Sequence, residues 1–367
     1  MEKSQLIRNA NRIVVKIGSQ LLEKNNSIDT QFIENLAENI AQNPDKEFII
    51  VSSGAVLAGV KKLGLKQKPV SITDKQAVAS VGQAYLMQIY DRIFSKYGKN
   101  IGQILLTVEG LRERKRYVLA QNTINRLLDM EVVPIVNEND TIAVEEIVFG
   151  DNDFLAAHVA VLTNADLLII LSTAGGVYTG EPGQEGSQLI EEIKDVSQAL
   201  QYAGTSKSKF GTGGMRSKLE AAQIATSHGI PVIISPKKED IISQTLAGRI
   251  TGSFIYPEKS KKLSRKKSWL KLLSAPKGRI IIDRGAEEAI RKGKSLLPAG
   301  IKDFEGIFSK NDVVAILNEE GKIIGKGIIN YSYKEIEKIK GKKSSEVENL
   351  LNRKFTEVIH RDNLVVF

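Results

Sequence analysis

The strongest constraint on the fold is a regular alternation of short apolar runs and longer amphipathic segments through the first 255 residues. Six runs are rich in Ile and Val and mostly too continuous to be half-exposed, which is typical of strands buried on both faces of a sheet. These runs are residues 12–18, 47–54, 101–107, 131–137, 166–172 and 230–235. Helical patterns accompany them at about 29–42, 54–63, 73–97, 115–129, 152–164, 215–228 and 238–246. The alternation predicts an α/β fold, a three-layer αβα sandwich with helices on both faces of a mainly parallel sheet.

The last part of the chain has a different pattern, in which the strand-like runs and the helices are both short. The expected strands are 278–283, 312–317, 322–330 and 363–367, and the expected helices are 284–292, 333–339 and 344–352. A chain of 367 residues also exceeds what one hydrophobic core usually serves. We therefore expect a second, small, β-rich domain.

The distribution of the net charge of +9 helps to place the boundary between the domains. Residues 1–257 carry a net charge of −1, residues 258–275 carry +6 and residues 276–367 carry +4. A basic run of this size is usually a solvated linker, and contact with nucleic acid or acidic lipid is the alternative. The predicted organisation is a domain over 1–257, a basic linker over 258–275 and a domain over 276–367.

The sequence contains no cysteine, which excludes disulfides and thiolate chemistry and fits a reducing compartment. The first twelve residues lack the apolar core of a signal peptide. The most apolar run, 167–171, is far too short to cross a bilayer. We expect a soluble cytoplasmic protein with no membrane partner.

Small or polar residues stand where several of the predicted strands end. They are Gly18 and Ser19, Ser52 to Gly54, Asn137 to Asp140, and Ser172 and Thr173. Ligands of parallel α/β sheets bind beyond the carboxyl ends of the strands. One such cluster would be an ordinary turn, but several at the same edge predict a binding site.

A glycine-rich segment, residues 211–218, precedes the predicted helix at 215–228 and reads Gly-Thr-Gly-Gly-Met-Arg-Ser-Lys. Small residues let backbone N–H groups approach an anion, and a helix N-terminus favours negative charge. Lys218 would stand in the first helical turn, within reach of the same phosphate. The segment is not a P-loop, because no Gly-Lys-Ser/Thr closes the pattern. A glycine-rich surface turn with an ordinary N-cap is the alternative.

Lys16 lies in the middle of an apolar strand, Val-Val-Lys-Ile-Gly-Ser. A lysine in that position is costly unless a ligand or a partner meets its charge. Phosphoryl transfer needs cations around the migrating group, a metal and correct positioning. Lys16 suits that role, and Gly18 and Ser19 would offer backbone N–H groups at the strand end. The alternative is an edge-strand lysine whose ammonium reaches solvent.

Two acidic motifs follow one another, Asn-Glu-Asn-Asp at 137–140 and Gly-Asp-Asn-Asp at 150–153. Carboxylates interleaved with Asn suit a polar amino-acid substrate or hydrated Mg²⁺. A pair of Asx-rich turns is the alternative, and Asp153 could be only a helix cap or a first-turn acid. The ligand spacing is wrong for an EF-hand.

The three histidines, at 158, 228 and 360, are scattered, so neither a His-ligated metal nor a Ser-His-Asp apparatus is expected. If the phosphoryl acceptor is a carboxylate, its ordinary pKa of about 4.3 makes it a nucleophile at neutral pH. No general base is then required. Two lysines, a carboxylate that orients them and Mg²⁺ would be enough.

The order of these motifs resembles the glutamate 5-kinase family of the amino-acid kinase fold. The matching motifs are VVKIGS, VSSGA, VNEND, GDND and GTGGM followed by Lys218, and the match runs through residues 10–255. The C-terminal part resembles a PUA domain through GRIIIDRGA at 278–286, GKSLLPAGI at 293–301 and IGKGI at 324–328. The pairing with a PUA domain distinguishes the chain from acetylglutamate kinases, aspartokinases and uridylate kinases.

The resemblance implies ATP-dependent phosphorylation of the γ-carboxylate of L-glutamate, the first step of proline synthesis, with Mg²⁺ and with feedback inhibition by proline. Lys16 and Lys218 would stabilise the transferring phosphoryl group and Asp153 would orient them. Glutamate would contact Ser53, Asp140 and Asn152, with Asn137 nearby. The implied ATP contacts are Lys16, Gly18, Ser19, Ser172, Thr173, Thr212, Gly213, Gly214, Met215, Arg216, Ser217 and Lys218. Direct protein ligands of a metal are not implied.

Two departures from the family pattern concern the nucleotide contacts. The family usually has Thr-Asp where this chain has Ser172 and Thr173. Arg216 stands where a small residue is commoner, so it either adds a phosphate contact or faces solvent.

The resemblance also implies a homo-oligomer, dimer or tetramer, and glutamyl-phosphate reductase as a pathway partner. An amino-acid-kinase-fold enzyme for another carboxylate or a nucleoside monophosphate is the nearest alternative. An RNA-binding protein is a further one, because PUA domains occur in RNA-modifying enzymes. Apart from Tyr331 and Tyr333, the C-terminal part lacks aromatic residues spaced for stacking, so nucleic acid is not an expected partner.

Overall fold

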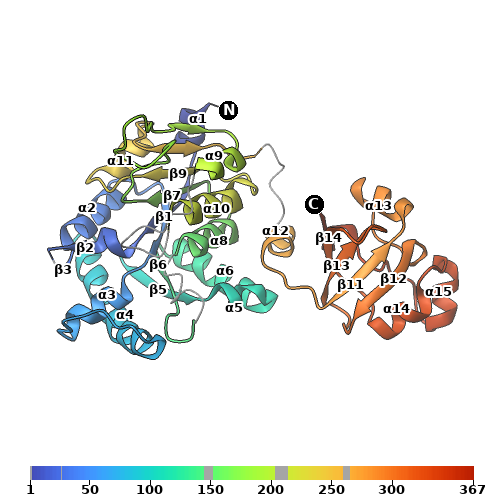
Figure 1. Ribbon diagram of the computed structural model, residues 1–367. Helices are drawn as coiled ribbons and strands as arrows, with labels where there is room; N and C mark the ends of the chain where they lie inside the picture. The colour runs from blue at the N-terminus through green and yellow to red at the C-terminus, as the bar shows by residue number, and fades with distance from the viewer. Residues whose placement is uncertain (1, 26, 144–151, 203–213, 259–264) are drawn as a thin grey trace. The chain divides into compact units, whose positions relative to one another are not determined.

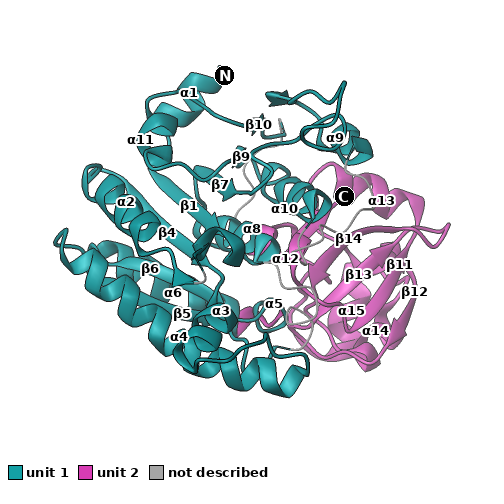
Figure 2. Ribbon diagram, turned by 60° about the vertical axis from the view of Figure 1, so that its left-hand side comes forward, with its two compact units in different colours: residues 1–111, 116–262 teal, residues 112–115, 263–367 magenta. Residues whose placement is uncertain are grey.

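The computed structural model describes all residues except 1, 26, 144–151, 203–213 and 259–264 (Figure 1). It contains two compact units (Figure 2). The first comprises residues 1–111 and 116–262, and the second comprises residues 112–115 and 263–367. The change from one unit to the other after residue 262 falls inside the predicted linker.

The first unit is built on an eight-stranded sheet with the strand order β5-β6-β4-β1-β7-β9-β10-β8. The strands are β1 (Arg12–Ile17), β4 (Glu47–Ser52), β5 (Ile101–Leu106), β6 (Val133–Glu138), β7 (Leu167–Leu171), β8 (Glu192–Ile193), β9 (Val232–Ser235) and β10 (Ser253–Ile255). The six predicted strands are confirmed and pair in parallel, whereas β10 runs antiparallel to β9. The sequence pattern missed β8 and β10, which are too short to show a hydrophobic period.

The helices of the first unit also follow the predicted alternation. They are α1 (Lys3–Arg8), α2 (Thr30–Ala41), α3 (Ala55–Lys62), α4 (Ile72–Ser95), α5 (Val108–Arg112), α6 (Arg114–Asp129), α8 (Asp153–Thr163), α9 (Val196–Tyr202), α10 (Met215–Thr226) and α11 (Ile241–Leu246). A 3-10 turn, Ser19–Leu22, and a small hairpin of β2 (Glu23–Lys24) and β3 (Ser27–Ile28) follow β1. Side-chain caps begin two of the helices, because Asp29 accepts from the N–H of Phe32 at 3.1 Å and Ser71 from that of Asp74 at 3.0 Å.

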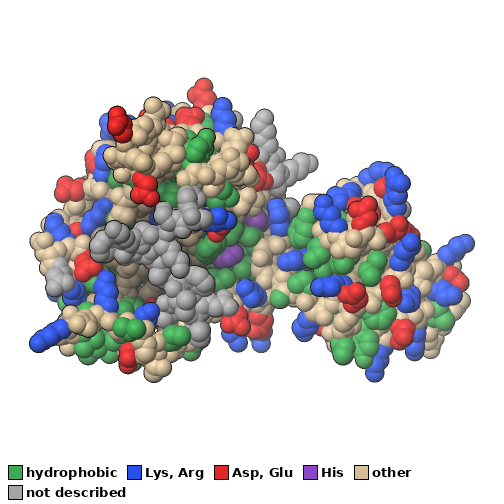
Figure 3. All heavy atoms as spheres, in the orientation of Figure 1, with side chains coloured by type: hydrophobic (Ala, Val, Ile, Leu, Met, Phe, Trp, Pro, Cys, Tyr) green, Lys and Arg blue, Asp and Glu red, His purple; other side chains and the backbone are tan. Residues whose placement is uncertain are grey.

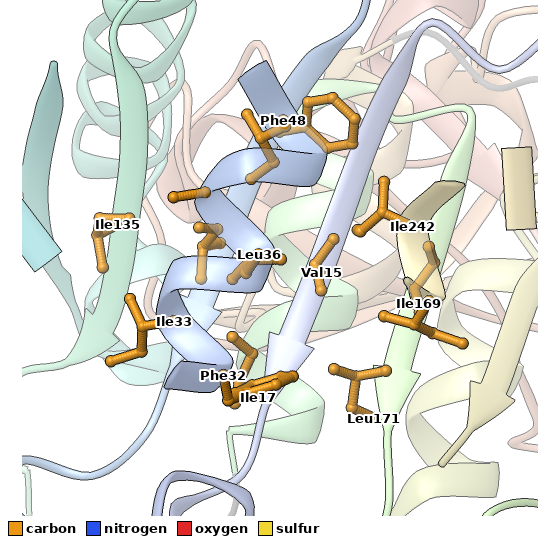
Figure 4. Close-up of a cluster of buried hydrophobic side chains, with 14 of the residues drawn as sticks. Val15, Ile17, Phe32, Ile33, Leu36, Phe48, Ile135, Ile169, Leu171 and Ile242 are labelled. Carbon is orange, nitrogen blue, oxygen red and sulfur yellow. The ribbon is translucent and has the colours of Figure 1, made fainter. Parts of the chain in front are cut away.

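Alternate residues of β1 serve opposite faces of the sheet, as the period of two in a strand requires. Val15 and Ile17 pack with residues of α2, including Phe32, in a buried cluster that also takes in β7 (Figure 4). Lys16 and Val14 therefore face the other side, where α8 lies against β1. This alternation places a lysine at the buried interface between the sheet and α8.

Two glycines let α3 and α4 pack with their backbones almost in contact. A Cβ built on Gly82 would lie 1.8 Å from the carbonyl oxygen of Ala55, and one on Gly59 would lie 2.0 Å from that of Val78. Neither obstacle is a flexible side chain, so neither can move aside cheaply. This crossing fixes α4, which carries residues of the site described below.

The second unit is a five-stranded sheet with the order β12-β11-β13-β14-β15. Its elements are α12 (Arg265–Leu272), β11 (Gly278–Ile282), α13 (Arg284–Arg291), β12 (Ile301–Gly306), β13 (Val313–Leu317), β14 (Ile323–Ile328), α14 (Tyr333–Ile339), α15 (Ser344–Leu351) and β15 (Leu364–Val366), with 3-10 turns at Pro298–Gly300 and Arg361–Asn363. The expected small β-rich fold is confirmed. The pattern missed β12, whose residues are mostly exposed and polar.

Part of the predicted linker is a helix that packs on the second sheet. The helix α12 contacts β14 and β15, and the Nζ of Lys326 donates to the carbonyl oxygen of Ser274 at 2.8 Å. Burial lowers the pKa of Lys326. Basic and acidic side chains are interspersed on the face of this unit seen in Figure 3. Several charged side chains of the unit are paired, such as Lys302 with Glu319 at 2.7 Å.

No helix in the described part of the chain combines the length and the apolar character needed to cross a membrane. The expected cytoplasmic location stays a prediction.

The close crossing of α3 and α4 yields a test of packing. We expect Gly82→Ala to lower the free energy of unfolding of the first unit by on the order of 3 kcal/mol, because the added methyl group has no space that a side-chain movement could provide. Gln88→Ala, on the exposed side of the same helix, should change it by less than about 0.5 kcal/mol. Urea unfolding followed by circular dichroism measures both, and equal effects of the two substitutions would contradict this packing.

Candidate active site

A buried carboxylate joins three elements that are far apart in the sequence. Asp153 is the first residue of α8 and is fully buried. Its Oδ1 contacts the Nζ of Lys16 in β1, and its Oδ2 accepts from the Nζ of Lys218 at 2.9 Å. Lys218 stands in the first turns of α10, whose contact with α8 brings it there. The structure therefore brings together the three residues predicted to be catalytic.

The cluster contains two cationic side chains and only one anionic side chain. A buried carboxylate is costly unless cations and hydrogen bonds meet it. Lys16 and Lys218 are 2% and 8% exposed, so both cations share the low-dielectric surroundings of Asp153. Together the three groups carry one positive charge, which suits an incoming anion such as a phosphoryl group.

The N-terminus of α10 adds backbone donors beside this cluster. Gly214 is the N-cap residue, so the N–H groups of the first turn lack partners within the helix. The Oγ of Ser217 donates to the carbonyl oxygen of Gly214 at 2.9 Å and lies 3.4 Å from the Oδ2 of Asp153. Arg216 pairs instead with Glu220, one turn further along, at 2.9 Å, and its side chain is 60% exposed. Met215 begins the helix, and Thr212 and Gly213 lie outside the described residues.

The end of β1 lies beside the ammonium of Lys16. A Cβ built on Gly18 would be 3.6 Å from the Nζ of Lys16. Ser19 begins the 3-10 turn that follows. Lys237, which sequence reasoning missed, holds this turn: its Nζ donates to the carbonyl oxygen of Leu21 and to the Oδ2 of Asp29, both at 2.6 Å.

Asp29, the second partner of Lys237, also caps α2. Burial acts to raise the pKa of Asp29, but the hydrogen bonds from Lys237 and from the N–H of Phe32 more than offset it and hold that pKa below its ordinary value. The Nζ of Lys237 also lies 4.6 Å from the ring centroid of Phe32. No sequence motif marks Lys237, since it is one of two adjacent lysines in the loop that follows β9.

Three buried amide side chains meet at the carboxyl end of β6. The Nδ2 of Asn152 donates to the Oδ1 of Asn137 at 2.7 Å, and the Nδ2 of Asn137 donates to the Oε1 of Gln83 at 2.7 Å. Asn152 is the N-cap residue of α8, directly before Asp153. Asn152 therefore connects the amides to the lysine-carboxylate cluster through its neighbour Asp153. Gln83 was not among the predicted site residues.

A cavity of about 250 Å³ lies between α4, β5 and the end of β6, and one of these amides, Gln83, lines it. Gln83, Glu138 and Asp140 are among its lining residues. The predicted substrate residue Asp140 thus lines the same cavity as Gln83. Its carboxylate suits a cationic group of a small polar ligand.

The carboxyl end of β4 is held by a buried hydroxyl pair. The Oγ of Ser52 and the hydroxyl of Tyr90 in α4 are 2.9 Å apart, and burial raises the pKa of Tyr90, which keeps that hydroxyl neutral. The N–H of Ser53 donates to the carbonyl oxygen of Ile17 at 3.0 Å, which ties β4 to the end of β1. Gly54 follows with a φ of 108°, a conformation that favours glycine.

Ser172 and Thr173 follow β7, where the sequence predicted contacts with ATP. Ser172 is buried, its N–H donates to the carbonyl oxygen of Ser235 at 2.8 Å, and its Oγ accepts from the N–H of Ala174 at 3.3 Å. Thr173 is exposed. Among the described residues, no hydrogen bond joins Ser172 to Lys16, Asp153 or Lys218, and no group of three or more His, Cys, Asp or Glu side chains could hold a metal ion.

Comparison with family models finds two matches in this chain. Residues 11–235 match the amino acid kinase family, and residues 278–351 match the PUA domain. The carbamate kinase from Giardia lamblia bound to AMP-PNP superposes with a TM-score of 0.50 at 14% identity, over 68% of this chain and 100% of that chain. At that identity the likeness shows the fold alone.

Curated relatives match over almost the whole length. The glutamate 5-kinase of Aquifex aeolicus (strain VF5) is 50% identical, over 97% of this chain and 99% of that protein. The glutamate 5-kinase of Carboxydothermus hydrogenoformans is 45% identical, over 99% of each. The resemblance seen in the motifs is thereby confirmed: this chain belongs to the glutamate 5-kinase family, within the amino acid kinase family, and carries a PUA domain.

Proposed function

We propose that the protein transfers the γ-phosphoryl group of ATP to the γ-carboxylate of L-glutamate, forming ADP and L-glutamyl 5-phosphate. The observation that carries this proposal is the cluster of Lys16, Asp153 and Lys218 at the carboxyl edge of the sheet. Membership of the glutamate 5-kinase family supports the choice of donor and acceptor.

This phosphoryl transfer requires little covalent catalysis by the protein. The γ-carboxylate is ionised at neutral pH, so it attacks phosphorus without a general base. As the bond to the β,γ-bridging oxygen breaks, negative charge develops on the migrating group and on the ADP leaving group. The ammonium groups of Lys16 and Lys218 stabilise that charge, and Asp153 keeps them oriented while the site is empty of phosphate.

The remaining predicted contacts divide between the two substrates. We propose that Ser53, Asn137, Asp140 and Asn152 bind glutamate. Backbone donors of Gly18, Ser19 and residues 212–218 would bind the ATP phosphates, and Ser172 and Thr173 would lie near the rest of the nucleotide. The side chain of Arg216 pairs with Glu220 on the helix surface, so we propose that Arg216 contributes its backbone N–H to this set.

A kinase uses ATP as its co-substrate, and Mg²⁺ is the ion that usually accompanies it. Both oxygens of Asp153 face lysines, so this carboxylate is not placed as a metal ligand. The donor set fits an Mg²⁺ held mainly by phosphate oxygens and water, which is common for this ion. Such an ion would neutralise phosphate charge.

The family membership supports three wider proposals. The product would enter proline synthesis through a reductase, glutamyl-phosphate reductase. Proline would inhibit by binding at or near the glutamate pocket, since it shares the α-carboxylate and an α-nitrogen cation with glutamate. The protein would act as a homo-oligomer.

The proposed reaction is tested by trapping the acyl phosphate. With ATP, Mg²⁺ and L-glutamate, we expect ADP release and, in the presence of hydroxylamine, a hydroxamate in equal amount. Proline should lower the rate. A hydroxamate yield no greater than that without glutamate would contradict the proposal, and a panel of aspartate, N-acetylglutamate and nucleoside monophosphates would then identify the acceptor.

Removal of one cation tests the catalytic cluster. We expect Lys218→Ala to lower kcat by on the order of 100-fold with the fold intact, because one donor to the developing charge is lost. The matched control is Lys96→Ala, which breaks an exposed pair with Glu34 at 2.9 Å and should leave kcat within about twofold. A near-normal kcat for Lys218→Ala would remove this residue from the mechanism.

A further inference from the structure

A second cavity, of about 340 Å³, lies at the amino-terminal edge of the sheet of the first unit. Its walls come from the ends of α2 and α6 and from the residues at or before the starts of β1, β4, β5 and β6. The lining residues are Asn11, Ile40, Pro44, Asp45, Lys46, Glu47, Phe48, Lys99, Leu128, Glu131, Val132 and Val133. The residues proposed to bind substrates lie at the opposite, carboxyl ends of β1, β4 and β6. Because a strand of six residues is roughly 17–20 Å long, this cavity is separate from the candidate active site.

Lys99 and Glu131 bring opposite charges to this cavity, and the two charges are not paired. Lys99 is half-buried and Glu131 is exposed. Within the part of the chain that the structure describes, no ion pair or hydrogen bond engages the ammonium of Lys99 or the carboxylate of Glu131. The two groups share one cavity without contacting each other, so a ligand that carries both charges could satisfy them together.

The other charged residues of the cavity wall have partners. Glu47 accepts a hydrogen bond from the Nε of Arg12 at 2.7 Å. The Nζ of Lys46 lies 3.5 Å from a carboxylate oxygen of the adjacent Asp45. The cavity therefore offers a ligand two unpaired charges, one positive and one negative.

The backbone of Glu131 has a left-handed conformation that a glutamate rarely adopts. Its φ is 58°, and the other four described non-glycine residues with a positive φ are all asparagine. The N–H of Glu131 donates to the carbonyl oxygen of Leu128, and the N–H of Val132 donates to that of Leu127, both at 2.9 Å. These are the hydrogen bonds of a Schellman motif, whose left-handed position is usually taken by glycine or asparagine. A glutamate in this strained position, at the wall of a cavity, points to a function for its side chain.

Buried apolar side chains form another part of the cavity wall. They belong to Ile40, Phe48, Leu128 and Val133. A ligand with an aliphatic group would remove that group from water against them, which favours binding. The volume of the cavity is at the lower end of the range found for small-ligand sites.

We propose that this cavity binds a small α-amino acid with an aliphatic side chain, its carboxylate at Lys99 and its ammonium at Glu131. An amino acid carries both charges in one small molecule, so it matches two opposite charges that do not reach each other. A simple anion would be attracted by Lys99 and repelled by Glu131, and a simple amine would experience the reverse. The site lies away from the proposed phosphoryl transfer and does not depend on it.

Ligand-observed NMR titration of the full chain with L-leucine and with L-valine tests this site. We expect at least one of them to bind with a Kd on the order of 1 mM or tighter. Analogues that lack one charge each are 4-methylpentanoate and 3-methylbutylamine for L-leucine, and their shorter homologues for L-valine. Each analogue should bind at least about tenfold more weakly than its amino acid, because one charge of the cavity stays unpaired.

Two substitutions assign the two charges. Lys99→Met should weaken binding of the amino acid about tenfold and leave that of the amine analogue within about twofold. Glu131→Asn should weaken binding of the amino acid about tenfold and should not weaken that of the carboxylate analogue. The matched control is Lys96→Met, which removes an exposed lysine that pairs with Glu34 and should leave the Kd within about twofold.

The stability of Glu131→Asn without ligand separates a binding role from a structural one. Asparagine accepts the left-handed conformation more readily, so Tm should stay unchanged or rise by about 1–3 °C. A fall in Tm would show that the fold requires Glu131 and would overturn the inference. Failure of both amino acids to bind, an unchanged Kd in Lys99→Met and Glu131→Asn, or an equal loss in Lys96→Met would also overturn it. Since binding is measured without turnover, none of these results bears on the proposed reaction.

Discussion

The buried carboxylate of Asp153 is the interaction on which the rest of the site depends. Its two oxygens contact a lysine of the first strand and a lysine of a helix that begins some 200 residues later in the sequence. Neither lysine could be buried there alone, and the carboxylate could not be buried without them. The cluster is therefore a structural joint between β1, α8 and α10, and its two lysines against one carboxylate suit the phosphoryl group that we propose it binds.

The sheet topology explains why this joint and the three buried amides lie side by side. Parallel strands bring their carboxyl ends to one edge, and α8 begins there with Asn152 and Asp153 adjacent in sequence. Asn152 donates to Asn137 of β6, whereas Asp153 contacts Lys16 of β1 and Lys218 of α10. The proposed acceptor side and the proposed phosphoryl side are thus both held by helices and strands, as precise chemistry requires.

Much of the fold and part of the candidate site could be predicted from the sequence, because the hydrophobic patterns and motifs that indicate them are local. The apolar runs predicted the six long strands, and a lysine inside one of them pointed to a charged partner. No clear hydrophobic period marks the very short strands β8 and β10 or the exposed strand β12. Gln83 and Lys237 could not be identified, since each looks like an ordinary polar residue until the fold brings it to its partners. The pairing of Arg216 with Glu220 likewise depends on rotamers that no motif shows.

The central claim is that Lys16 and Lys218 converge on the migrating phosphoryl group. The most direct measurement is a crystal structure with a nonhydrolysable ATP analogue, Mg²⁺ and L-glutamate. We predict that the Nζ atoms of both lysines lie at hydrogen-bond distance, about 2.7–3.2 Å, from oxygens of the terminal phosphate, with the γ-carboxylate in line. A terminal phosphate bound elsewhere, with both lysines still contacting only Asp153, would contradict this account.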